Sequence, residues 1–457
     1  MKGLPPPPSP DHSAFLLISY LFPPAGGVSV QRALSFAKYL PDHGFRVHVL
    51  AARNPSTPTI DAGLLRHIPP AVTVHRTFTP EVPYRWKQRV WRWISPARGG
   101  ASSAARTPTP APAASDTWKT ALGRQVRKLF CPDPEVVWVP FALRRARRLV
   151  SQYGIRTVLT TAPPFSAFLI GTDLKKYFPH LTLIADFRDE WLEFYLSTFQ
   201  FHRDDYIVRR STAMERATVE LSDLVLSVTP SIVQQLRDRY PDQPARKFVN
   251  LPNGYDPDTF RDFRPRPHPG DQIVVTYVGT VYTASSPRFY LDGLDRLPDA
   301  LRARFETRFV GRIVPEEMPH LAGRKSVIRQ LGFMSQADAF RQMEETDYLL
   351  LVMTDAGSLT GKIFEYLATG KPILAFAPRG GEVERILHET GAGWCADPAD
   401  PSAIHQLLVQ AAEAAGSARP IQPNPEAIRR YERPQLTAEL ARLIQDLRTS
   451  SSGSLLP

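Results

Sequence analysis

Short apolar runs alternate along the chain with longer segments in which apolar residues recur every three or four positions. The first run, Ala14 to Ser19, is typical of a strand buried in a parallel sheet, and Pro23 to Gly27 follows it as a turn. The pattern then predicts a helix from about Val28 to Leu40 and a second strand from Gly44 to Leu50. Strand, helix and strand in this order predict an α/β protein with parallel strands.

The alternation continues in two later parts of the chain. The first contains predicted strands at 156–160, 181–185 and 224–229 and a helix at 165–177. The second contains predicted strands at 273–279, 305–310, 327–331, 348–353 and 372–376 with helical patterns between them. We therefore predict two Rossmann-like, doubly wound domains.

Proline-rich and low-complexity stretches suggest where these domains begin and end. The expected divisions are an unstructured N-terminus over 1–12, a first domain over 13–255 with a low-complexity insertion at 95–115, a linker over 256–269, a second domain over 270–423, a C-terminal helical segment over 424–447 and a tail over 448–457. The insertion contains too few large apolar residues to form a core.

Composition agrees with a globular protein of two domains, because 457 residues exceed what one hydrophobic core usually supports. Cys131 and Cys395 are far apart in sequence, which suggests neither a disulfide framework nor a zinc site. The N-terminus lacks the apolar core of a signal peptide, and no window approaches the ~18 apolar residues of a membrane span. Two locations stay open: free in the cytoplasm, or peripherally attached to the inner face of the cytoplasmic membrane.

The chain carries 56 basic and 45 acidic residues, a net charge of +11, which favours anionic partners. The basic residues form no aligned stripe and no standard nucleic-acid motif, so we expect no nucleic-acid partner. One segment, 84–93, interleaves three tryptophans with four basic residues and suits a membrane interface. A helix that docks on the first domain, or a platform for single-stranded nucleic acid, would have the same composition.

The stretch from Ser358 to Leu374 has the chemistry of a ligand site. Thr360 and Gly361 open a helix whose dipole and free N–H groups suit a diphosphate, and Lys362 adds a positive charge. Glu365 lies about one turn further and can accept hydrogen bonds from the hydroxyls of a ribose. The alternative is an ordinary connection between a helix and a strand.

These residues resemble the nucleotide-binding element of the family-four retaining glycosyltransferases, which have the GT-B fold. Where that family shows Glu-x7-Glu, this chain has Gly357 in the first position and Glu365 in the second. The resemblance covers most of 13–447. It includes Gly26 and Gly27 with Arg32 downstream, and an Asp-Phe-Arg-Asp-x-Trp string at 186–191 that resembles one branch of the family.

The resemblance implies specific site residues. The implied donor site comprises Gly279, Thr280, Arg312, Phe333, Met334, Ser358, Leu359, Thr360, Gly361, Lys362, Ile363 and Glu365. Thr280 stands where relatives often carry an arginine. The implied loop for acceptor and diphosphate comprises Gly26, Gly27 and Thr161, and Arg188 and Asp189 are the implied catalytic residues. Two structural alternatives stay open: an ion pair of Arg188 with Asp186 and Asp189, and threonines that cap the turn after 160–161.

The implied activity is transfer of a hexosyl or related group from a nucleotide-diphosphate sugar to a hydroxyl of a sugar or lipid-linked acceptor. The resemblance implies retention of configuration, no cofactor, no metal ion, a cleft between two domains and a C-terminal helix that returns to the first. No Asp-x-Asp pair follows a predicted strand, in agreement with a metal-free site. Surface polysaccharide or glycoconjugate biosynthesis would use such an enzyme. A nucleotide-sugar epimerase on the same fold and an inactive binding protein are the alternatives.

Overall fold

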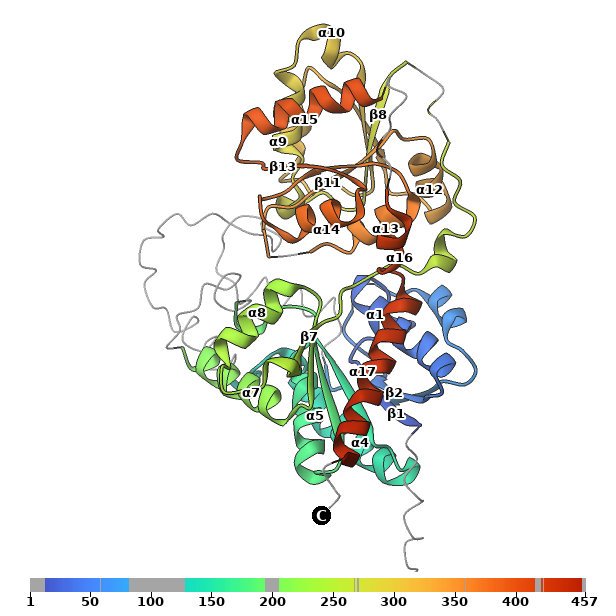
Figure 1. Ribbon diagram of the computed structural model, residues 1–457, viewed down its shortest axis with the longest axis vertical. Coiled ribbons are helices and arrows are strands. Elements are labelled where there is room, and N and C mark those ends of the chain that lie inside the picture. Colours follow the sequence, from blue (N-terminus) through green and yellow to red (C-terminus); the bar gives the residue numbers. More distant parts are fainter. Residues whose placement is uncertain are drawn as a thin grey trace, which may run out of the picture. The chain divides into compact units, whose positions relative to one another are not determined.

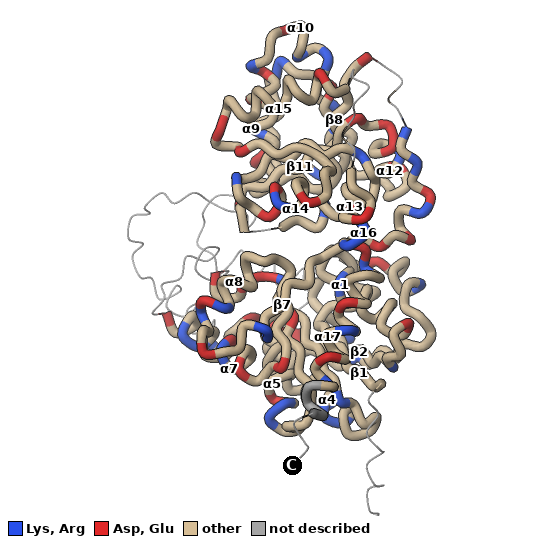
Figure 2. Tube along the Cα trace, viewed as in Figure 1, with Lys and Arg blue, Asp and Glu red and all other residues tan. Residues whose placement is uncertain are grey.

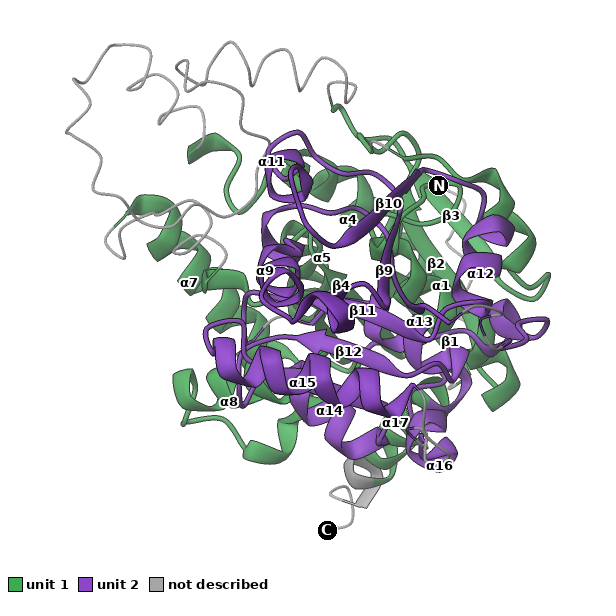
Figure 3. Cartoon of the chain, turned by 90° about the horizontal axis from the view of Figure 1, so that it is seen from above, with its two compact units in different colours: residues 1–99, 109–252, 436–457 green, residues 100–108, 253–435 purple. Residues whose placement is uncertain are grey.

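The computed structural model describes residues 13–57, 59–81, 128–193, 205–266, 268, 271–357, 359–415, 421 and 423–453. Several predicted features lie outside these residues: the N-terminus at 1–12, the tryptophan-rich segment 84–93, the insertion 95–115 and Ser358. The described chain forms two compact units (Figure 3). Unit 1 comprises the described residues up to Pro252 and from Leu436 onward, and unit 2 runs from Asn253 to Gln435.

Unit 1 is built on a parallel sheet of seven strands (Figure 1). The strands are β1 (Ala14–Ile18), β2 (Arg46–Ala52), β3 (Thr73–Thr77), β4 (Thr157–Ala162), β5 (Thr182–Phe187), β6 (Leu224–Ser227) and β7 (Phe248–Asn250). Their order is β3-β2-β1-β4-β5-β6-β7, so the direction of winding reverses between β1 and β4. Ligands of doubly wound sheets bind at the carboxyl ends of the strands beside such a reversal.

Helices cover both faces of this sheet. They are α1 (Val28–Tyr39), α4 (Val139–Tyr153), α5 (Ser166–Tyr177), α6 (Trp191–Glu193), α7 (Tyr206–Leu221), α8 (Pro230–Arg239) and α17 (Arg433–Gly453). Strand β1 is fully buried because its alternating side chains enter two different cores. Phe15 and Leu17 pack with α1 and α17, and Leu16 and Ile18 pack on the side of α4 and α5.

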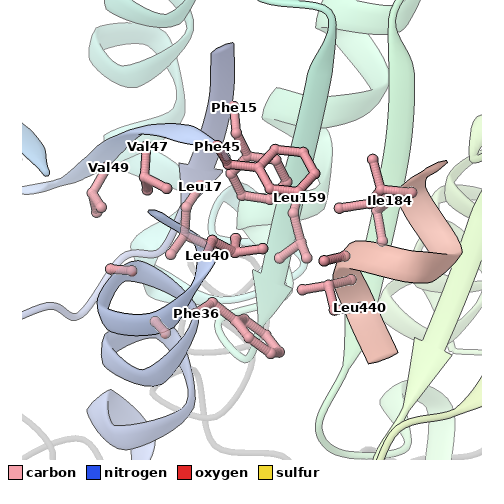
Figure 4. Close-up of a cluster of buried hydrophobic side chains, with 14 of the residues drawn as sticks. Phe15, Leu17, Phe36, Leu40, Phe45, Val47, Val49, Leu159, Ile184 and Leu440 are labelled. Carbon is pink, nitrogen blue, oxygen red and sulfur yellow. The ribbon is translucent and has the colours of Figure 1, made fainter. Parts of the chain in front are cut away.

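The C-terminal helix returns to unit 1, as predicted. Leu440 and Ile444 of α17 are completely buried in the same core as Phe36 and Leu40, which Figure 4 shows in close-up. The helix continues to Gly453, beyond the predicted end at 447.

Unit 2 contains a parallel sheet of six strands in the order β10-β9-β8-β11-β12-β13. The strands are β8 (Ile273–Val278), β9 (Phe305–Val310), β10 (Val327–Gly332), β11 (Tyr348–Val352), β12 (Ile373–Phe376) and β13 (Gly393–Ala396). The helices are α9 (Arg288–Asp295), α10 (Asp299–Arg302), α11 (Met318–Leu321), α12 (Gln336–Glu344), α13 (Lys362–Thr369), α14 (Glu382–Thr390), α15 (Pro401–Ala414) and α16 (Pro425–Arg429). The winding reverses between β8 and β11.

The predicted fold class, two doubly wound α/β units with a returning C-terminal helix, is confirmed. Three strands were absent from the sequence prediction: β3, β7 and β13. Each lies at the edge of its sheet, pairs with only one neighbouring strand and is only partly buried. None therefore shows the long run of large apolar residues that is typical of a central strand. No helix in the described parts of the chain combines the length and apolar character that crossing a bilayer requires.

Candidate functional site

The predicted donor residues gather at the carboxyl edge of the sheet in unit 2. Parallel strands end at the same edge, and β10, β9, β8 and β11 are consecutive in the sheet. Those predicted residues that the structure describes are Gly279 and Thr280 after β8, Arg312 after β9, Phe333 and Met334 after β10, Leu359, Thr360 and Gly361 after β11, and Lys362, Ile363 and Glu365 in α13. The site therefore lies at the winding reversal, where doubly wound sheets bind ligands.

Lys362 is the centre of this group. Its Nζ lies 4.3 Å from the centre of the Tyr277 ring and donates a hydrogen bond to Tyr277 Oη. Tyr277 Oη in turn donates to the backbone oxygen of Thr280 at 2.8 Å. The lysine side chain passes over Gly279, where an added Cβ would lie 2.5 Å from Lys362 Cε. Gly279 also has a φ of +125°, which residues with side chains rarely adopt, so its backbone conformation favours glycine.

Electrostatics at this position suit an anionic ligand. Burial lowers the pKa of Lys362 to about 8, and the nearby Glu365 charge opposes this shift. Desolvation also raises the pKa of Glu365, against the charges of Arg433 and Lys362. Both groups are therefore less stable as ions than in water, and a bound diphosphate would favour the charged form of the lysine.

The start of α13 provides a dipole, but its amide groups have local contacts. The N–H of Lys362 faces Thr360 Oγ1 at 3.4 Å, the N–H of Ile363 faces Thr360 O at 3.3 Å, and the N–H of Phe364 faces Gly361 O at 3.2 Å. These distances exceed the ~2.9–3.0 Å usual for N–H···O bonds, so the contacts are weak. The side chain of Ile363 is fully buried in the core, so its contribution to a ligand would come from its backbone.

Close glycine packing brings the ends of β8, β9 and β10 together. Gly311 has a φ of +128°, and a Cβ added to it would lie 2.3 Å from Gly279 O. The N–H of Gly311 donates to Gly332 O at 2.7 Å, and Val281 donates to Arg312 O at 2.8 Å. Arg312 is exposed beside this junction, and the Phe333 side chain, which follows β10 directly, is 91% exposed.

The loop after β11 contains Gly357 in place of the glutamate that the resemblance expects. Its N–H donates to Asp355 Oδ1 at 3.1 Å. The loop is held from two sides, because Thr354 Oγ1 donates to Ala284 O at 3.5 Å and the N–H of Glu382 donates to Ala356 O at 3.2 Å. Asp355 is therefore an exposed carboxylate on an anchored loop at the reversal of winding.

Sequence reasoning missed Asp355, Tyr277 and Arg433 as members of this group. An acidic residue just after an apolar run was a signal that could have indicated Asp355. Tyr277 contacts Lys362 across 85 positions of sequence, and Arg433 acts on Glu365 from the start of α17. Nothing in the local pattern around either residue shows these contacts.

In unit 1, Gly26 and Gly27 form the turn between β1 and α1. Gly26 is buried, its N–H donates to Thr59 O at 3.0 Å, and an added Cβ would lie 3.0 Å from Thr59 Cγ2. Gly27 caps α1 with a φ of +93° and is exposed. The first glycine thus permits close packing of two loops, and the second permits the turn that opens the helix.

Arg188 lies at the end of β5 and binds backbone oxygens. Its Nε donates to Ala162 O at 3.2 Å, and its two terminal nitrogens donate to the oxygens of Ser29 and Pro163. Burial lowers its pKa, against the charges of Asp186 and Asp189. Arg188 therefore ties together the loops after β1, β4 and β5.

The suggested ion pair of Arg188 with Asp186 is wrong, because Asp186 binds Arg32. Arg32 Nε lies 3.1 and 2.9 Å from the two carboxylate oxygens, and Arg32 Nη2 lies 2.8 Å from Asp186 Oδ1. Thr161 Oγ1 donates to Asp186 Oδ2 at 2.7 Å, which also replaces the suggested capping of the turn by this threonine. Asp186 is completely buried and its charge is thus paired and hydrogen-bonded.

Asp189 is the remaining charged group at this edge. Its side chain is exposed, yet neighbouring protein atoms desolvate the carboxylate and raise its pKa, while Arg188 opposes the shift. The structure brings Gly27, Arg188 and Asp189 to neighbouring strand ends, since β1, β4 and β5 are consecutive in the sheet. No grouping of His, Cys, Asp and Glu suited to a metal ion occurs among the residues that the structure describes.

Comparisons with known proteins identify the fold. No family model matches the chain. A probable glycosyltransferase of Pseudomonas aeruginosa, WbjE, is 42% identical over 52 residues, which span 11% of this chain and 13% of that protein. The chain thus covers about an eighth of the length of this relative.

Three solved structures are similar over nearly the whole chain. Sucrose-phosphate synthase from Thermosynechococcus elongatus is 15% identical, with a TM-score of 0.61 over 96% of this chain and all of that one. HepE from Anabaena, in complex with UDP and glucose, is 14% identical with a TM-score of 0.55 over 95% of this chain and all of that one. The lipopolysaccharide outer core galactosyltransferase WaaB is 12% identical, with a TM-score of 0.56 over 95% of this chain and 99% of that one. These similarities show that the chain has the GT-B fold.

Proposed function

We propose that this protein is a glycosyltransferase that moves a sugar from a nucleotide-diphosphate sugar to an acceptor hydroxyl. The observation that carries the proposal is the group of Lys362, Tyr277 and Gly279 at the start of α13, with Glu365 one turn further. A cation, a helix start and a carboxylate close together are the groups that would bind a nucleoside diphosphate, which supports the proposal. The GT-B fold supports the proposal, and so does the short match to a probable glycosyltransferase.

Each part of the donor has a proposed partner. Lys362 and Arg312 bind the diphosphate together with the backbone of Gly279, Thr280 and the loop 358–361. Glu365 accepts hydrogen bonds from the ribose hydroxyls. The loop at Phe333 and Met334 receives the base, for which the exposed Phe333 ring is suited.

Transfer requires stabilisation of the departing diphosphate and orientation of the acceptor. The dipole of α13 and the Lys362 and Arg312 charges supply the first, so we propose a metal-independent reaction. The resemblance to the retaining family supports retention of configuration. In this proposal Asp355, whose carboxylate binds the N–H of Gly357, accepts hydrogen bonds from the transferred sugar, because Gly357 has no side chain to do so.

Unit 1 receives the acceptor in this proposal. Arg188 fixes the loops at the carboxyl edge, and Asp189 orients or deprotonates the acceptor hydroxyl. Gly27, which is exposed at the start of α1, allows close approach of the acceptor or diphosphate, and Gly26 supports this turn by packing against the loop at Thr59. Thr161 acts through Asp186, which it holds. We propose a sugar or lipid-linked acceptor from surface polysaccharide or glycoconjugate synthesis, in the cytoplasm, with membrane contact through segment 84–93.

Two other functions predict different results. An epimerase would convert the donor sugar without an acceptor, and an inactive GT-B protein would bind nucleotide without turnover. The second is motivated by Gly357 and Thr280, which replace charged residues of the family pattern.

Thermal-shift measurements with nucleoside diphosphates and their sugars test the proposal. A cognate donor at 100 times its Kd stabilises the protein by about 2.7 kcal/mol and raises Tm. Turnover of that donor should then depend on an added acceptor. Absence of stabilisation by every nucleoside diphosphate and sugar nucleotide would refute donor binding, and sugar conversion without acceptor would favour the epimerase.

A further inference from the structure

Exposed apolar side chains flank the interval between residues 81 and 128. On one side, Phe78 follows β3 and is 51% exposed, and its ring packs edge-to-face on Phe141, 43% exposed, at 5.9 Å. On the other side, Leu129 is 77% exposed and Phe130 is also exposed. Exposed apolar residues usually occur singly on protein surfaces. Four large ones near the two ends of one interval are therefore unusual.

Basic side chains accompany both pairs. Arg144 and Arg148 follow Phe141 by three and seven positions, so all three lie on one face of α4, and both arginines are exposed. Helix α4 contains four arginines and no acidic residue. Next to Leu129, Lys128 Nζ lies 5.6 Å from the centre of the Tyr206 ring at the start of α7. Figure 2 shows Lys and Arg in blue on both helices.

Both pairs belong to one edge of unit 1. The chain between them contacts α7 through Cys131, whose Sγ lies 3.7 Å from Ser211 Oγ. It passes the start of α5, where Asp133 accepts a hydrogen bond from the N–H of Ser166 at 2.9 Å. It then reaches the end of β3, where Trp138 donates to Thr77 Oγ1 at 2.8 Å. The segment therefore follows the carboxyl edge of the sheet, with an exposed apolar pair at each end.

Positive charge is concentrated in the sequence of the interval that these pairs flank. Residues 82–127 contain nine basic side chains and one acidic one, so they hold eight of the eleven net positive charges of the protein. They also contain four of its seven tryptophans. The remaining 411 residues carry a net charge of only +3, so most of the net positive charge belongs to the interval that joins Glu81 to Lys128.

We propose that this edge of unit 1 docks on an anionic lipid surface through Phe78, Phe141, Leu129 and Phe130, with Arg144 and Arg148 facing the headgroups. Apolar side chains gain free energy at the boundary between headgroups and acyl chains, and basic residues near an anionic leaflet are attracted to its surface. The aliphatic Leu129 favours lipid over nucleic acid, which selects flat aromatic surfaces for its bases. The proposal is independent of sugar transfer.

Co-sedimentation of the full chain with vesicles tests it. The protein should sediment with vesicles of phosphatidylcholine and phosphatidylglycerol, much less with phosphatidylcholine alone, and less again in high salt. Replacing Leu129 and Phe141 by serine, and separately Arg144 and Arg148 by glutamate, should each weaken binding at least fivefold. Val327→Ser with Met318→Ser, and Lys325→Glu with Arg379→Glu, alter exposed residues of unit 2 and are the matched controls.

Two results would overturn the proposal. One is failure of the unaltered protein to bind anionic vesicles. The other is equal vesicle binding by the patch variants and the controls, which would leave the tryptophan-rich segment as the sole contact. Tighter binding to a single-stranded oligonucleotide, lost in the same variants, would identify a nucleic-acid surface instead. Each variant is used only if its Tm matches the unaltered protein, and Leu129→Gln with Phe130→Gln replaces a variant that fails.

Discussion

Raising the pH from 7 to 9 should weaken the binding of a nucleoside diphosphate about tenfold, through the loss of one proton from Lys362. The pKa of this lysine in the unliganded protein is about 8, because its ammonium group is buried against Tyr277 and Gly279. Only the charged lysine attracts the diphosphate. The affinity therefore falls as pH rises through this pKa.

The magnitude follows from the fraction of protein that carries the charge. With a pKa of about 8, roughly nine tenths of the lysine is protonated at pH 7 and roughly one tenth at pH 9. The observed Kd is divided by that fraction, so it rises about tenfold over the interval. An ordinary lysine, with a pKa near 10.4, would stay charged over the same range and produce no change.

Isothermal titration calorimetry at pH 7, 8 and 9 and constant ionic strength measures this effect. Lys362→Met should bind more weakly at pH 7 and show no dependence on pH up to 9. Lys325→Met removes an exposed lysine of the same unit and should behave like the unaltered protein. A flat profile in the unaltered protein, or the same slope in Lys362→Met, would refute the role of Lys362.

Four further measurements test other parts of the structure. Glu365→Ala should weaken donor binding at least ~10-fold with unchanged Tm, since a charged hydrogen bond contributes about 1.5–3 kcal/mol; calorimetry showing unchanged affinity would remove it from the site. Arg32→Ala should lower the free energy of urea unfolding by about 3–5 kcal/mol, because it leaves the buried Asp186 charge without its partner. The double variant Arg32→Met with Asp186→Leu removes both charges and should lower that free energy far less; an equal decrease in the two variants would contradict this reasoning. Leu440→Ala should cost about 2–5 kcal/mol, and a loss below 1 kcal/mol would contradict its place in the core. Burial lowers the pKa of His75 to about 4, so the contribution of this residue to stability should fall by on the order of 3 kcal/mol between pH 6.5 and 4, as the unfolded chain binds the proton first. The difference in unfolding free energy between the unaltered protein and His75→Leu should decrease by that amount as the pH is lowered, and a constant difference would refute the shift.

The fold was predictable because the central strands are fully buried and their local patterns agree with their tertiary role. Strand β1 has five buried residues in a row, and α1 repeats its apolar residues with helical spacing. Strand β3 was not predictable, because its sequence Thr-Val-His-Arg-Thr contains a single apolar residue and only His75 is buried. Edge strands need less apolar surface, so their sequences resemble those of loops.

The site was predictable as a set of strand ends but not as a set of contacts. The order of motifs placed Gly279, Lys362 and Glu365 at one edge of one sheet. Periodicity could not show that Tyr277 supports Lys362, or that Arg32 and not Arg188 pairs with Asp186, because such contacts depend on the packing of distant segments. Charged residues in sequence are therefore better guides to where a site lies than to which groups bind one another.

The return of α17 to unit 1 has a consequence for the order in which the chain folds during synthesis. Unit 2 is continuous in sequence from Asn253 to Gln435, so all of its strands have left the ribosome before the last helix does. The core of unit 1, although it contains the earliest strands, lacks Leu440 and Ile444 until the final residues are translated. Domains usually fold in the order in which they are made. Here the first half to be synthesised is the last to be completed, and the apolar side chains that pack against Leu440 and Ile444 stay uncovered until then.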